Sequence, residues 1–216
     1  NPVDAEALKS SGVIIPYLKQ DSISIDAFTD YKPQVNMMPR VSFSFKLNDK
    51  SSFFAHYDVL TQRPTTANIG RFVDYLFIEQ NSTQAIANPA LKPQKTIDYE
   101  VGFMSDLDEK GHFELTISAF YREMRDMIQS FRYFNAEPIT YDSYRNLDFG
   151  TVKGFIFGFR GLASSMISFN LNYTLQFAQG TGSNANSGRN ALAGVVGFAA
   201  NRYLLPFDFD QRHTFT

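Results

Sequence analysis

The 216-residue sequence contains no cysteine and no tryptophan, and it has only 3 histidines. Without cysteine the chain has no disulfide, no thiolate nucleophile and no cysteine metal site. No stretch approaches the roughly 18 consecutive apolar residues of a membrane-spanning helix, which excludes a helical membrane protein. The net charge of −2 lacks the basic excess of nucleic-acid-binding proteins, so we expect no nucleic-acid partner.

Aromatic residues are abundant, with 22 Phe and 11 Tyr, and they recur with a period of two. The chain is organised around residues 88–103, which begin with the turn-forming Pro89 and Pro93 and continue as a strand. One face of this strand carries Ile97, Tyr99, Val101 and Phe103, and the other carries Thr96, Asp98, Glu100 and Gly102. Two faces of this kind are typical of a half-buried soluble sheet or of a membrane barrel.

Seven segments share the alternation and are predicted as strands: 40–47, 53–60, 95–103, 113–124, 148–160, 167–177 and 207–215. Asn48, Asp49 and Lys50 predict a tight turn between the first two. Strand extensions are predicted at 127–134 and 139–144, and helical spacing of apolar residues predicts an amphipathic helix over 68–80.

The connections alternate in length along the chain. Short turns are expected near 48–50, 105–111 and 161–165, and long excursions over 61–92, 125–144 and 178–205. In an antiparallel meander all short turns then lie at one end and all long loops at the other. Greek-key sandwiches mix the two ends, whereas outer-membrane barrels separate them. The predicted fold is all-β: about seven strands of a transmembrane antiparallel β-barrel, with short periplasmic turns and long extracellular loops.

Several segments resemble one family. NPALKPQKTIDYEVGF is similar to the NPxLKPE-[KR]TxxYExGF segment of TonB-dependent outer-membrane receptors, and FFAHYDVLTQRP, NLDFGTVKGFIFGF, LNYTLQFAQGTGSN and LPFDFDQRHTFT resemble further barrel segments in the family's order. The resemblance covers residues 38–216 and is strongest to the large, SusC-like receptors of Bacteroidota-type bacteria. Gln94 replaces the family's acidic residue, and Ile156 occupies a position where a polar residue is expected.

The resemblance implies a 22-stranded barrel in the bacterial outer membrane, with an N-terminal plug inside it. Such a protein imports a bulky nutrient with energy delivered by TonB, and a surface lipoprotein lid is a further implied partner. The sequence begins without the features of a signal peptide and ends in mid-alternation at Thr216, so we expect the chain to be an internal piece of a longer protein, or the ordered part of one. The plug and the TonB-contacting segment are expected in that longer protein.

No catalytic or metal constellation is apparent, so we expect no enzyme, cofactor or metal. Asp106, Asp108 and Gly111 resemble the start of a calcium loop, but its twelfth position is Ile117 rather than Glu. The 3 histidines lie on separate strands. Polar side chains on the face opposite the aromatic residues are instead candidates for the lumen and for ligand binding: Asp98, Glu100, Glu114, Arg122, Asn170, Asn172, Asp210 and Arg212. Arg122 and Glu114 are expected to pair with the carboxylates across the strand.

On the opposite, lipid-facing side, candidates for interface anchors are Tyr57, Tyr99, Tyr121 and Tyr173. Replacing Val101 or Leu171 with Arg should impair assembly, whereas Asn170 or Glu100 should tolerate replacement. Two alternatives to import remain open. In one, a receptor-like barrel acts as a structural or assembly subunit of a larger outer-membrane complex. In the other, the chain is a soluble β-sandwich adhesin or hydrolase.

Overall fold

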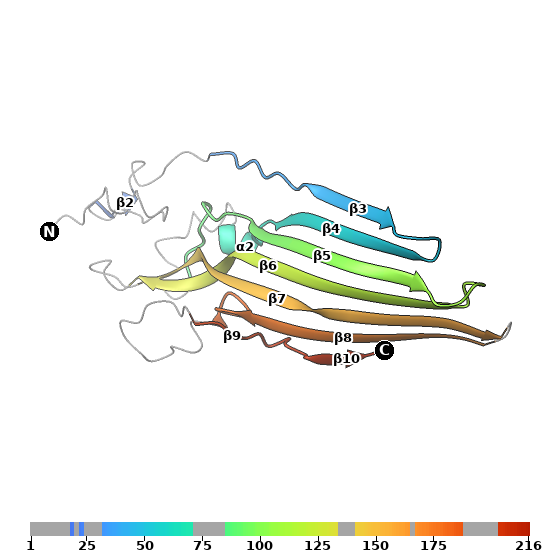
Figure 1. Cartoon of the computed structure of the whole chain (residues 1–216). Helices are drawn as coiled ribbons and strands as arrows, with labels where there is room; N and C mark the ends of the chain where they lie inside the picture. The colour runs from blue at the N-terminus through green and yellow to red at the C-terminus, as the bar shows by residue number, and fades with distance from the viewer. Residues whose placement is uncertain are drawn as a thin grey trace.

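The computed structural model describes residues 18–19, 22–23, 32–70, 85–133, 141–164, 167–187 and 203–216. Two short strands, β1 (Leu18–Lys19) and β2 (Ser22–Ile23), pair only with each other. All other strands form one antiparallel sheet (Figure 1). Within the described residues, no helix is long and apolar enough to cross a membrane.

The main sheet is a meander in which each long strand pairs with the next one in the chain. Its order is β10-β8-β7-β6-β5-β4-β3, and β9 also pairs with β8. The strands are β3 (Arg40–Lys46), β4 (Ser51–Gln62), β5 (Gln94–Asp106), β6 (Phe113–Tyr133), β7 (Tyr141–Ser164), β8 (Ile167–Gly180), β9 (Leu205–Pro206) and β10 (His213–Phe215). The prediction of an antiparallel meander is confirmed. The described strands form a wall with edges at β3 and β10, not a closed barrel.

The short turns all lie at one end of this wall, and each successive turn lies farther along the strand direction (Figure 1). The register row that passes through Phe45, Phe103 and Phe157 shows this shift. Phe45 is one position from the end of β3, Phe103 is three from the end of β5, and Phe157 is seven from the end of β7. A steady stagger of this kind is the shear that tilted strands need to close into a barrel.

The outer face of the wall is apolar and open. Side chains at alternate positions remain largely exposed although they are hydrophobic, among them Phe43 (56% exposed), Val101 (47%), Phe155 (50%) and Leu171 (57%). An exposed apolar face of this extent is costly in water but favourable in lipid. Phe155, Phe157 and Phe159 of β7 lie on this face as predicted, which places Ile156 on the inner face between Ser118 and Thr174.

Glycines on the inner face are covered by aromatic rings, a feature that the alternation alone did not reveal. Phe54 lies over Gly102, its register partner on β5, and Phe120 lies over Gly154 on β7. Phe207 lies over both Gly150 and Gly180. A ring over a glycine fills the space that the missing side chain leaves and holds the register of the two strands.

Two sequence predictions need correction, and a third is confirmed. The expected helix over 68–80 is not continuous, because α2 (Thr66–Ile69) ends at Gly70, whose φ of 87° is outside the helical range. Residues 71–80 lie outside the described part of the chain. By contrast, the strand extensions predicted within the excursion over 125–144 are confirmed in the described residues, because β6 continues to Tyr133 and β7 begins at Tyr141. The expected strand over 207–215 is split, since amides of Asp210 and Gln211 bond back to Phe207 and Phe209 and form a turn before β10.

Candidate functional site

A row of four charges crosses the inner face of the wall on four neighbouring strands. Arg40, Asp58, Asp98 and Arg122 are register partners in that order from β3 to β6. Arg40 Nε donates to Asp58 Oδ1 at 2.9 Å, and Arg122 Nε donates to Asp98 Oδ1 at 2.5 Å. The pairing of Asp98 with Arg122 is the one expected from the sequence. The two adjacent carboxylates repel each other, and the flanking guanidinium groups offset that repulsion.

A second charged pair lies near the short-turn end of the same face. Glu114 accepts from Arg160 Nη2 at 2.6 Å, so its partner is on β7 and not on β5 as predicted. The reason is register: the β5 residue opposite Glu114 is Asp106, a like charge. Asn170 is the register partner of Arg160 on β8, and Asn172 Nδ2 donates to Asn170 Oδ1 at 3.4 Å.

Glu100 lies between these groups, next to the inner aromatic rings. Its register partners are His56 on β4 and Phe120 on β6, and no side-chain hydrogen bond joins it to another described residue. The inner-face candidates therefore spread along the wall. Asp98 and Arg122 lie toward the long loops, Glu100 lies at the middle of β5, and Glu114, Asn170 and Asn172 lie toward the short turns.

Asp210 and Arg212 do not join either group. Asp210 Oδ1 accepts from the backbone N–H of Ala178 at 2.8 Å, so the carboxylate takes the place of a strand carbonyl beside β8. Arg212 Nε lies 3.5 Å from Asp210 Oδ2, and its guanidinium lies 5.0 Å from the ring centroid of Phe177, which belongs to the apolar face. The sequence placed both residues on the inner face because it treated this segment as one regular strand.

At the loop end, the segment before β5 is hydrogen-bonded to the extension of β7. Asn88 Nδ2 donates to the carbonyl of Tyr144 at 2.9 Å, and Asn88 Oδ1 accepts from the N–H of Ala90 at 2.9 Å. Asn146 bonds both backbone groups of Lys92, at 2.9 Å each, and donates to the carbonyl of Asp126 at 2.7 Å. These two asparagines hold residues 85–93 in a fixed position above the wall.

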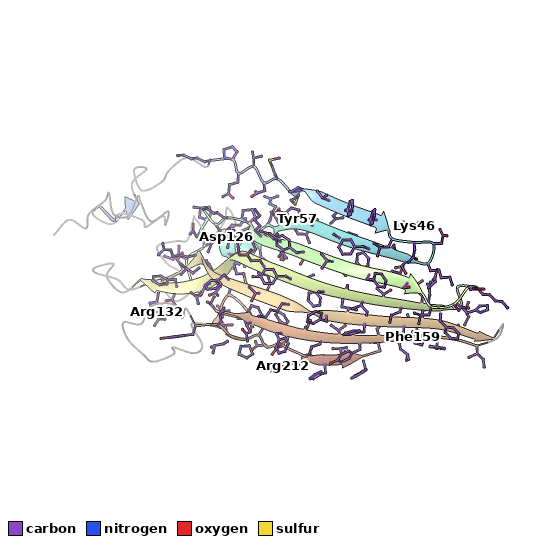
Figure 2. All side chains as sticks on the ribbon, viewed as in Figure 1. Lys46, Tyr57, Asp126, Arg132, Phe159 and Arg212 are labelled. Carbon is purple, nitrogen blue, oxygen red and sulfur yellow. The ribbon has the colours of Figure 1, made fainter. Side chains whose placement is uncertain are left out.

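The extension of the β6–β7 hairpin has different neighbours from the wall below it. In the wall β6 lies beside β5 and β7 beside β8. Above it the amide of Ser130 on β6 bonds the carbonyl of Ala185, which follows β8, whereas Asp142 of β7 bonds Ile86, which precedes β5. The exchange follows an irregularity at Met124/Met127, where Asp126 has a φ of 56°. A bulge increases twist and redirects a strand, which accounts for the exchange. Asp126 and Arg132 mark this region in Figure 2.

A buried carboxyl group lies where this extension begins. Asp148 is 3% exposed; its Oδ1 accepts from Thr181 Oγ1 at 2.8 Å, and its Oδ2 has no hydrogen-bond partner. Asp148 lies sixteen positions from the short-turn end of β7, beyond the membrane-spanning part of the strand. Burial raises the pKa of Asp148, and the hydrogen bond from Thr181 opposes that shift only in part. The sequence pattern gives no sign of this buried carboxyl group, because its burial depends on residues more than thirty positions away.

The described residues contain no arrangement that indicates catalysis. Among them, no three His, Cys, Asp or Glu side chains come together as metal ligands. Asp108, part of the calcium-like pattern, instead accepts from the N–H groups of His112 and Phe113 and closes the β5–β6 turn. Burial works to raise the pKa of Asp108, but the hydrogen bonds from those two amides together lower it. The chemistry present is that of polar contacts on an inner wall.

Comparison with known proteins supports the barrel fold. A family model described as "Outer membrane protein beta-barrel family" matches residues 19–216. No curated protein matches the chain.

Three solved structures are similar over part of the chain. The outer membrane transporter YddB from Escherichia coli is 15% identical, with a TM-score of 0.50 over 68% of this chain and 20% of its own. The pyoverdine receptor FpvA from Pseudomonas aeruginosa PAO1, solved with pyoverdine bound, is 17% identical, with a TM-score of 0.49 over 65% of this chain and 18% of its own. The copper transporter OprC is 15% identical, with a TM-score of 0.43 over 69% and 21%. The chain therefore spans about a fifth of each of these structures, and the likeness to YddB supports the fold alone.

Proposed function

Since the chain belongs to the outer membrane protein β-barrel family and so lies in the outer membrane, we propose that it is part of the barrel of a TonB-dependent receptor. In this role it binds a bulky nutrient and takes part in its import across the outer membrane, without catalysis. The observation that carries the proposal is the polar inner face with its row of Arg40, Asp58, Asp98 and Arg122. A polar inner face of this kind is typical of a barrel with a water-filled lumen through which a ligand can pass.

The resemblance of NPALKPQKTIDYEVGF to the receptor family gives the proposal its second support. The structure adds a physical reason for that segment: Asn88 and the backbone of Lys92 are the groups that bind the β7 extension. The segment thus fixes how a long loop enters the wall. We extend the proposal to the SusC-like branch, in which a surface lipoprotein closes over the loop end, because the resemblance is strongest there.

The test uses the full-length protein extracted from the outer membrane in detergent. Its mass and terminal sequence are determined, and its binding to the purified periplasmic domain of TonB is measured by surface plasmon resonance. Import predicts a chain several times longer than 216 residues, with a plug and with TonB binding. A control surface carries an unrelated periplasmic protein. A large barrel that lacks a plug, does not bind TonB and copurifies with other outer-membrane proteins would be evidence for the scaffold role. That result overturns the proposal.

A further inference from the structure

The outer face carries its charges at one end only. Among the described strand residues of that face, from the short turns up to the bulge in β6, the formally charged side chains are Lys95, Glu123, Arg125 and Lys153. Outside the strands, Arg212 also lies against Phe177 on this face, where it pairs with Asp210. All four lie toward the long loops. Lys95, Glu123 and Arg125 lie beyond the register row formed by Tyr57, Tyr99 and Tyr121, and Lys153 on β7 continues that row beside Tyr121. We call Lys95, Arg125 and Lys153 the basic rim.

The basic rim lies at one height above the short-turn end. Lys95 is eleven positions from Asp106, Arg125 is twelve from Phe113, and Lys153 is eleven from Ser164. At ~3.4 Å per residue and a tilt of ~40°, this places the rim about 30 Å above the short turns. The apolar band of such barrels is about 25 Å tall. The rim therefore lies just beyond the hydrocarbon, level with lipid headgroups on the loop side.

The row of tyrosines below the rim agrees with this placement. The rings of Tyr57, Tyr99 and Tyr121 contact one another along the register, with centroids 5.2 and 6.2 Å apart. They lie six to eight positions from the short-turn ends of their strands. Tyr57 is visible toward the loop side in Figure 2. Tyrosine is enriched where the apolar core of a membrane meets its headgroups.

The rim has an excess of positive charge. Lys95 and Arg125 are direct register partners, and like charges in that position repel each other. Glu123 neutralises only Arg125, at 2.7 Å. Lys95 and Lys153 form no ion pair with a described residue, so the rim keeps two positive charges in a chain whose net charge is −2. The inner face at this end differs, because its two arginines are each paired with an aspartate.

We propose that the basic rim binds the phosphate groups of lipopolysaccharide in the outer leaflet. Three observations support this proposal. The chain lies in the outer membrane, the basic rim is at the height of the lipid headgroups, and the excess positive charge of the rim has no partner among the described residues. Phosphate is the group of lipid A that complements ammonium and guanidinium. The bound lipid relieves the repulsion between Lys95 and Arg125 and fixes the depth of the wall in the membrane. This inference rests on the membrane location and not on import.

The first test measures lipid selectivity of the full-length protein in detergent. Native mass spectrometry compares retention of diphosphoryl lipid A with retention of dephosphorylated lipid A of the same acyl chains. The proposal predicts strong preference for the phosphorylated form. Equal retention of the two means that acyl chains alone hold the lipid, and this overturns the proposal. If inorganic phosphate at millimolar concentration displaces the lipid fully, the rim is a site for free phosphate, which also overturns it.

The second test removes the unpaired lysines. The double variant K95Q/K153Q should bind diphosphoryl lipid A about 30-fold more weakly, since each cation near an anionic surface is worth about 5-fold. The matched control is K50Q/K110Q, which removes two exposed lysines from the short turns and should bind as the wild type does. Both variants should show unchanged heat-modifiable mobility, the mark of a folded barrel. Equal affinity of the two variants overturns the proposal even if lipid selectivity is observed.

Discussion

Replacing Leu171 with Arg tests the assignment of the two faces most directly. Leu171 lies on the outer face, is 57% exposed, and is four positions from the start of β8. At ~3.4 Å per residue and a tilt of ~40°, this is about 10 Å above the short-turn end, near the middle of a band about 25 Å tall. Arginine at the midplane costs about 2–4 kcal/mol. The free energy of unfolding in lipid should fall by that amount, which is about 30- to 700-fold in the equilibrium constant.

The control is the same substitution at the next residue. Asn172 lies on the inner face opposite Gly158, which leaves space for a longer side chain. L171R and N172R are made in the full-length protein and compared by outer-membrane yield, heat-modifiable mobility and urea unfolding in lipid vesicles. L171R should lose folded protein while N172R stays within about 1 kcal/mol of the wild type. Equal effects at both positions would refute the two-face model, and so would a tolerated L171R.

Three further predictions concern the inner wall and the loop end. Gly154→Ala should destabilise the wall by about 1–3 kcal/mol in urea unfolding, because a Cβ there overlaps the carbonyl oxygen of Leu175; wild-type stability would contradict the geometry. Asn146→Ala should increase hydrogen exchange at the amide of Lys92, which loses its acceptor, while folded yield and heat-modifiable mobility stay unchanged. The raised pKa of Asp148 means that the folded state holds a proton more tightly than the unfolded state. Its contribution to stability is therefore complete below the unfolded pKa and falls as pH rises through the folded one. Asp148→Asn should flatten this dependence in pH-dependent unfolding, and an unchanged slope would exclude Asp148 as its source.

The regular part of the wall follows from local sequence, and the irregular part does not. Alternation with a period of two fixes which face each residue of β5 or β8 occupies, and the register places Asp98 beside Arg122. The bulge at Asp126 has no local signal, because an aspartate with positive φ is held there by the hydrogen bond that its carbonyl accepts from Asn146, twenty positions later. The same applies to Asp210, whose carboxylate bonds the amide of Ala178 and interrupts the expected strand.

The functional candidates predicted from the sequence fall into two groups in the structure, and the strand register explains this division. In the sequence pattern all polar residues of one face look equivalent, but the strand register places them at different heights above the short turns. Glu114 near the short turns and Asp98 near the loops pair with different arginines on different strands. The exchange of neighbours above the bulge then connects both long loops to one hairpin, through Ser130 on one edge and Asp142 on the other. The described ends of the two loops, residues 85–93 and 181–187, are thereby attached to one hairpin at the loop end of the wall.

This arrangement bears on how the proposed import would select its cargo. The charges that cross the inner face near the loops cancel in pairs, Arg40 with Asp58 and Arg122 with Asp98. A surface whose charges are paired at 2.9 Å or less produces little net field at a distance, so it does not attract ligands of one sign. Each pair nevertheless keeps exposed polar edges that can exchange one hydrogen bond for another as a ligand passes. For the import proposed above, recognition along this section of the wall would therefore depend on hydrogen bonding and not on electrostatic attraction.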